Sequence, residues 1–238
     1  MTLASRFFRW HRWLGYLVAL QVLAWVAGGV LFAWLPFQAW VKSADHVRKP
    51  QQEWPAGWSR RLAAGLPAEL EAAGFHAVAT AAGPALRVKT PAAERWFGPD
   101  GTELPAPDAA AVERFARALY RGPGPFIGLQ RLDQVPIRLG IVRELHAGSA
   151  VWQARFEDPW RTRLYIDARS GEFLAARNEA WVWYDFFWRL HLMDYGGGED
   201  FNNPLLRTAA PLALGLVLTG GVLTMLALRR AARARRAR

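Results

Sequence analysis

Two long runs without a charged residue constrain this chain more than any other feature. No charged residue occurs between Arg12 and Lys42 or between Arg207 and Arg229, and both runs are mostly apolar. A helix needs about 20 apolar residues to cross a bilayer core, and only helices and closed barrels can cross it. The runs therefore predict transmembrane helices at 13–37 and 208–228. A cleaved signal peptide is the alternative for the first run, but this run is too long and lacks a small-residue cleavage site.

The charged flanks of these runs predict the orientation of the chain. Residues 1–12 carry three arginines and residues 229–238 carry six, and neither segment contains an acidic residue. Positive flanks stay in the cytoplasm, so we expect both termini there and the intervening domain on the far side, in the bacterial periplasm. That domain is nearly neutral, so the net charge of +10 reflects membrane topology rather than nucleic-acid binding. We also expect the arginine tail to contact anionic membrane lipid.

Composition and motifs exclude several classes of chemistry. The chain contains no cysteine, which excludes disulfides, thiolate catalysis, iron–sulfur clusters and covalently attached c-type haem. It has no G-x-S-x-G motif and no convincing pair of carboxylates for acid–base work. The sequence therefore predicts no catalytic residue.

The exported region reads as two similar units after a linker at 38–57. The first unit, 58–106, should contain a helix that starts or restarts near Pro67, followed by short strands. The second, 107–178, begins with a clear amphipathic helix that ends at Gly122. One pattern recurs 68 residues later, which predicts a repeat of one helix plus a small antiparallel sheet, although hairpins also converge on such patterns by chance. The paired positions are Arg87 and Arg155, Pro91 and Pro159, Arg95 and Arg163, and Phe97 and Tyr165.

A segment dense in aromatic residues precedes the second apolar run. Residues 179–195 predict a helix lying in the headgroup layer, where aromatic side chains gather, and 196–207 predicts a flexible link into the second span. This helix is the expected surface for a partner or for lipid. Its candidate interface residues are Trp181, Trp183, Tyr184, Phe187, Trp188, Asp194 and Tyr195.

Three segments resemble the PepSY-associated transmembrane family. FRWHRWLGYLVAL resembles the H-R-W-x-G motif at the start of that family, and YDFFWRLHLMDY resembles its aromatic W-x-L-H segment. Residues 151–177 are similar to a PepSY domain, whose closing hairpin has a Y-x-D-x-x-T/S-G-E pattern. The resemblance implies a helix packed on a small antiparallel sheet. It also implies association with iron uptake, siderophore reduction or periplasmic redox maturation. The resemblance does not extend to residues 42–106, whose PepSY-like fold is predicted from the internal repeat alone.

The resemblance also singles out His11 and His191, because each matches a histidine of the family. Larger relatives are thought to carry b-type haem through histidines, which makes these two the candidate ligands of a haem iron. They should lie on opposite sides of the membrane, about 30 Å apart, so one chain cannot place both on one iron. A homodimer or a partner subunit would supply the missing ligands. Alternatively, His11 lies among the arginines and His191 caps the aromatic helix.

These features predict a PepSY-type accessory subunit of the inner membrane, in an iron-uptake or periplasmic redox system, with electron transfer through haem b in a dimer or with a partner subunit. The alternative is a haem-free binding or assembly module, or a regulator of a periplasmic peptidase. We expect an α+β membrane protein in either case, with two transmembrane helices enclosing a PepSY-like domain.

Overall fold

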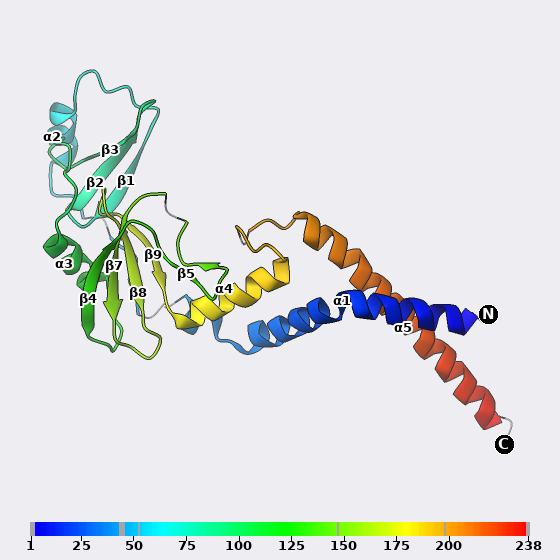
Figure 1. Ribbon diagram of the computed structural model, residues 1–238. Helices are drawn as coiled ribbons and strands as arrows, with labels where there is room; N and C mark the ends of the chain where they lie inside the picture. Colours follow the sequence, from blue (N-terminus) through cyan, green and yellow to red (C-terminus); the bar gives the residue numbers. More distant parts are fainter. Residues whose placement is uncertain (1–2, 43–45, 52, 147, 198, 237–238) are drawn as a thin grey trace. The chain divides into compact units, whose positions relative to one another are not determined.

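Two long helices begin and end the chain, and antiparallel sheets lie between them in sequence, in the computed structural model of Figure 1. Both helices are long and apolar enough to cross a membrane. The α+β class with two candidate membrane spans is therefore confirmed. The chain forms two compact units, a helical unit (Met1–Leu35 with Tyr184–Arg238) and a central domain (Pro36–Trp183). The structure describes residues 3–42, 46–51, 53–146, 148–197 and 199–236.

The helical unit is built on the contact between α1 (Leu3–Trp34) and α5 (Pro204–Arg236). Small residues mark this contact. A Cβ added at Gly215 would lie 3.4 Å from the Leu14 side chain, and one at Gly15 would lie 3.8 Å from that of Leu216. Glycine therefore lets the two backbones approach closely, as is common between helices in membranes.

The last nine residues of α4 (Glu179–Leu192) belong to the same unit and pack on α1. The ring of Tyr184 lies 4.9 Å from that of Phe32. The Gln21 side chain donates a 2.8 Å hydrogen bond to the carbonyl of Leu190. The Trp25 side chain donates another of 2.8 Å to the carbonyl of His191. Asn203 donates to the next carbonyl, that of Leu192. Side-chain donors thus satisfy three of the last carbonyls of α4, which an apolar environment without water requires. The predicted place of this helix in the headgroup layer stays a prediction.

The first half of the central domain is α2 followed by a three-stranded antiparallel meander. The helix predicted to start near Pro67 is wrong, because α2 ends at Gly65 and residues 66–73 are not helical. Leu66 is extended (φ −66°, ψ 140°) because proline disfavours the helical region for the residue before it. Gly65 also packs closely on Gly101, which adopts a φ of 84°. The elements are α2 (Trp58–Gly65), β1 (Gly74–Thr80), β2 (Gly83–Lys89) and β3 (Glu94–Phe97).

The second half repeats this plan with the predicted amphipathic helix α3 (Ala109–Leu119) and a four-stranded sheet of order β4-β7-β8-β9. Asp108 caps the helix by accepting a 2.7 Å hydrogen bond from the Ala111 amide. Val112 and Ala116 of α3 pack on Leu164 and other buried apolar residues of one sheet face. The strands of this sheet are β4 (Phe126–Leu132), β7 (Val151–Phe156), β8 (Arg163–Asp167) and β9 (Phe173–Arg177). Between β4 and β7 lies the short hairpin of β5 (Ile137–Arg138) and β6 (Val142–Arg143). At the start of the central domain, before both halves, lies a π-helix, η1 (Phe37–Val41).

The two halves differ in register and meet at the turn before β9. Arg87 pairs with Trp96 in the first sheet, whereas the corresponding Arg155 pairs with Arg163, which is a shift of one residue. Glu172 joins the sheets, because its carboxylate accepts from the Trp96 indole at 2.5 Å and lies 3.3 Å from a guanidinium nitrogen of Arg87. A backbone bridge between Thr80 and Glu172 also joins the two halves, so both the main chain and the side chain of Glu172 contribute to their contact.

Candidate functional site

A groove of ≈1220 Å³ lies in the central domain, between α3, β9, the turn joining β1 to β2, and the segment 46–51. Val47 of that segment forms an antiparallel bridge with Tyr120, directly after α3. Two backbone bonds flank the bridge, from the Arg48 amide to the Leu119 carbonyl (2.9 Å) and from the Arg121 amide to the His46 carbonyl (2.7 Å). The bridge therefore fixes one wall of the groove against the end of α3.

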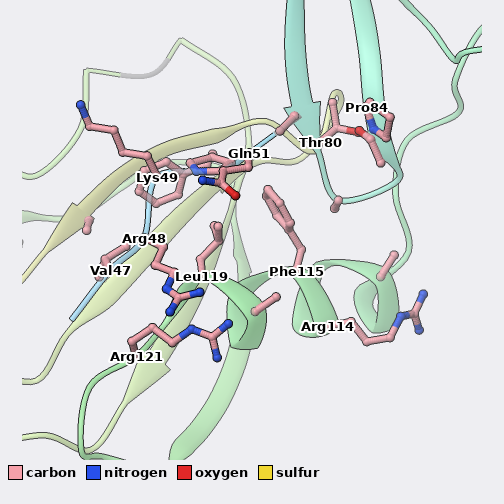
Figure 2. A pocket seen from close by; sticks show the side chains of 18 of the residues that line it. Val47, Arg48, Lys49, Gln51, Thr80, Pro84, Arg114, Phe115, Leu119 and Arg121 are labelled. Carbon is pink, nitrogen blue, oxygen red and sulfur yellow. The ribbon is translucent and has the colours of Figure 1, made fainter. Parts of the chain in front are cut away.

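This bridge also brings two arginines to one face. Residues flanking a bridged pair lie on the opposite side from the pair itself, so Arg48 and Arg121 share a face while Val47 and Tyr120 point to the core. As diagonal neighbours, their Cβ atoms are about 7 Å apart. Figure 2 shows both side chains beside Leu119, extending in the same direction. Such a pair is suited to hold one anionic group between two planar guanidinium groups.

The groove is strongly basic at its rim and apolar on its floor. Its described lining includes six basic side chains and one carboxylate, that of Glu53. Within the described ranges, no ion pair occupies Arg48, Lys49 or Arg121, and all three are exposed. Figure 2 shows Phe115 and Leu119 extending from α3 toward the segment that carries Lys49. The geometry therefore favours a ligand with an anionic group and an apolar part.

Tyr120 and Asp158 hold the end of α3 that supports the groove. The Tyr120 hydroxyl donates a 2.9 Å bond to Asp158 and accepts one of 3.1 Å from the Gly124 amide. Burial raises the pKa of Tyr120 to about 12, so the hydroxyl stays protonated at physiological pH. Asp158 in turn accepts from the Thr162 amide and hydroxyl. This buried network connects the residue after α3 to the chain before β8.

The opposite face of the four-stranded sheet carries a buried ionic cluster. Glu144, only 2% exposed, accepts hydrogen bonds from Arg163 at 2.5 and 3.0 Å and another from the Tyr165 hydroxyl. Arg163 also donates to Glu179 (2.8 Å), which Arg138 binds from the other side at 3.0 and 3.1 Å. A cavity of ≈420 Å³ lies over this cluster. The cluster links β8, the chain after β6 and the first residue of α4.

The charges in this cluster stabilise one another. Burial acts to lower the pKa of Arg163, but hydrogen bonds to Glu144 and Glu179 outweigh it and raise that pKa. Burial acts to raise the pKa of Glu179, but hydrogen bonds from Arg163 and Arg138 lower it overall. Burial, followed by the charge of Glu144, raises the pKa of Tyr165. These shifts keep Arg163 and Glu179 charged and Tyr165 protonated, and each moves the pKa away from the physiological range that a general acid or base needs. We therefore interpret the cluster as structural.

His11 lies in the contact between α1 and α5. Its Nδ1 is 3.1 Å from the Leu216 carbonyl oxygen and 3.1 Å from the Thr219 hydroxyl oxygen. A carbonyl only accepts, so bonding to Leu216 places the proton on Nδ1. Gly220 makes room for the ring, because a Cβ there would lie 3.1 Å from the His11 Cε1. Packing and hydrogen bonding between the helices therefore account for His11.

His191 lies near the end of α4 among the rings of Trp25, Phe32 and Trp188, whose centroids are 6.0–6.5 Å from its own. Its Nδ1 is buried and has no hydrogen-bond partner in the part of the chain that the structure describes. The predicted position at the outer end of the span is refined by these contacts, because His191 packs beside Trp25, 14 residues along α1 from His11. That offset corresponds to about 21 Å along a helix.

One chain by itself does not fit a bis-histidine haem. His11 and His191 lie at different levels of α1, and each ring is enclosed by its own neighbours. No group of three or more histidine or carboxylate side chains that could hold a metal ion occurs among the described residues. A second subunit would have to supply the other ligand at each level, so the haem hypothesis depends on an assembly.

The predicted interface residues fall into separate places. Trp181 lines the groove, where the Arg177 guanidinium stacks on its ring at 4.2 Å. Asp194 accepts hydrogen bonds from four backbone amides and thereby shapes the turn between α4 and α5. In the helical unit, Tyr184 and Trp188 pack on Phe32, and the Phe187 backbone lies near Gly28. Trp183, the last residue of the central domain, and Tyr195 of the helical unit are half exposed.

Sequence reasoning missed both the arginine pair and the buried cluster. Arg48 and Arg121 are 73 positions apart, and only the bridge at Val47 brings them together. Glu144 lies in an irregular stretch and belongs to no motif that we identified in the sequence. Arg163 was identified there only as a position of the internal repeat. We found no family model that matches the chain, no similar curated protein and no similar solved structure.

Proposed function

We propose that this chain is a membrane-anchored binding subunit of the PepSY type, whose central domain lies on the periplasmic side and holds an anionic partner in the basic groove. The groove is the observation that carries the proposal, because it combines exposed cations, an apolar floor and a wall held by backbone hydrogen bonds. Family membership rests on the three sequence segments quoted above. A role beside an iron-uptake or periplasmic redox system follows from that resemblance.

The groove favours binding over catalysis. It contains no histidine and one carboxylate among its described lining residues, so it lacks the pair of groups that acid–base or nucleophilic chemistry requires. Its cations are exposed and face an apolar floor, which is typical of recognition by charge and shape.

A fluorescent hexaglutamate peptide, used as a polyanionic probe, tests this proposal with the full chain in detergent. We expect binding that weakens in the double variant Arg48→Gln, Arg121→Gln. The matched control is Arg131→Gln, Arg143→Gln, which removes two exposed arginines of the same domain that line no described part of the groove. Equal binding by all three proteins would contradict the proposal.

Electron transfer through haem b, in a homodimer or with another subunit, is the competing hypothesis. Its support is the resemblance together with the buried Nδ1 of His191. A visible spectrum of the protein expressed with haem supplied separates the two. We expect no Soret or α band. A reduced α band that disappears in His191→Ala would establish the haem hypothesis instead.

A further inference from the structure

We propose that the anionic group held by the basic groove is the headgroup phosphate of an anionic membrane phospholipid, one with a net negative charge, seated between Arg48 and Arg121. This inference rests on the proposed function and names the ligand class of the same site. It adds a third attachment of the chain to the membrane, besides the two candidate spans.

Chain connectivity keeps the groove within reach of a bilayer that α1 crosses. Lys42, which lines the groove, is eight residues after Trp34, the last residue of α1. Eight extended residues span at most about 28 Å. On the other side, Trp181 also lines the groove and is three residues before Tyr184, where the continuous helix α4 passes into the helical unit. Three helical residues correspond to about 5 Å along the axis. The groove is therefore tethered at two places to the membrane-anchored unit.

Because these two connections are short, lipid headgroups are the anions with the highest local concentration near the groove. Binding to a group that is held nearby is effectively intramolecular, so weak individual contacts suffice. The chemistry of the groove agrees, because guanidinium pairs bind phosphate through parallel hydrogen bonds. The floor formed by Phe115 and Leu119 would receive the glycerol and the first part of an acyl chain.

An acidic peptide is the other anion to consider. Nothing at the groove selects a peptide over a phosphate, whereas the two tethers favour an anion that belongs to the membrane. We therefore argue for phospholipid and leave the acidic peptide as an outcome of the test.

Titration of the full chain in a neutral detergent tests the inference by calorimetry. The probes are dihexanoyl phosphatidylglycerol, dihexanoyl phosphatidylcholine, inorganic phosphate and hexaglutamate. Each basic residue near a membrane surface contributes about 1 kcal/mol to binding anionic lipid. The variant Arg48→Gln, Arg121→Gln should therefore bind phosphatidylglycerol roughly 30-fold more weakly. Arg131→Gln, Arg143→Gln and the tail variant Arg230→Gln, Arg233→Gln should bind much as the parent chain does.

The outcomes separate failure of the inference from failure of the proposed function. Phosphatidylcholine or inorganic phosphate binding as well as phosphatidylglycerol would overturn the inference. Hexaglutamate binding through Arg48 and Arg121 without phosphatidylglycerol binding would overturn it and leave the anion-binding function in place. No anion bound through these arginines would overturn both. Should the double variant fail to fold, the single variant Arg48→Gln provides the same comparison with an expected loss of roughly fivefold, because Arg48 is exposed and lines the groove.

Discussion

Removing the Glu144 side chain should destabilise the central domain strongly. In Glu144→Ala, the nearly buried Arg163 guanidinium loses two charge-assisted hydrogen bonds and keeps those to Glu179 and to the Arg161 carbonyl. The Tyr165 hydroxyl, fully buried, also loses its acceptor. Breaking a buried ion pair by removing one partner costs about 3–5 kcal/mol. A domain of this size would then lose roughly 6–20 °C of melting temperature.

The assay is thermal unfolding of the full chain in detergent, followed by near-ultraviolet circular dichroism. Glu103→Ala is the matched control, because Arg95 is the counterpart of Arg163 in the other half and its 2.5 Å pair with Glu103 is exposed. We expect the control to melt with the parent chain, since solvent screens exposed pairs. A loss below about 1 kcal/mol in Glu144→Ala would refute the account of the cluster, because it falls below the range for a broken buried pair.

Two further predictions concern Glu179 and Gly220. The folded-state pKa of Glu179 is lowered below its ordinary value of 4.5, so its contribution to stability is complete above that pH and is lost as the pH falls through the folded pKa. Urea unfolding between pH 7 and pH 3 should show a smaller acid-induced loss in Glu179→Gln than in the parent chain, and identical slopes would contradict this. Gly220→Leu should weaken the α1–α5 contact by about 1–3 kcal/mol of overpacking, because a Cβ there meets His11, whereas Gly221→Leu meets nothing within 4 Å. Thermal melts of both variants check this, and equal melting temperatures would argue against the observed packing of His11.

Patterns of short range predicted much of the fold. The apolar runs around Ala19 and Leu216 indicate long helices because charge is excluded over the whole run. The α3 helix follows from the spacing of Val112, Ala116 and Leu119 on one face and from the glycine at 122 that follows it. These signals depend only on neighbours in the chain, which is why they could be read without a structure.

Features that depend on contacts between distant segments could not be predicted. The close packing of Gly65 on Gly101 joins residues 36 positions apart, and the helix predicted near Pro67 does not form. The groove wall depends on the bridge between Val47 and Tyr120. The depth of His191 depends on hydrogen bonds that α1 donates to the end of α4.

Cysteine labelling measures the central claim most directly, namely that two spanning helices hold the central domain on the periplasmic side. The chain has no cysteine, so single cysteines at Ala92 in the domain and Ala232 in the tail, both exposed positions, report without background. A membrane-impermeant maleimide added to intact spheroplasts should label Ala92→Cys and spare Ala232→Cys until the membrane is lysed. Labelling of Ala232→Cys in intact spheroplasts, or protection of Ala92→Cys, would contradict the account.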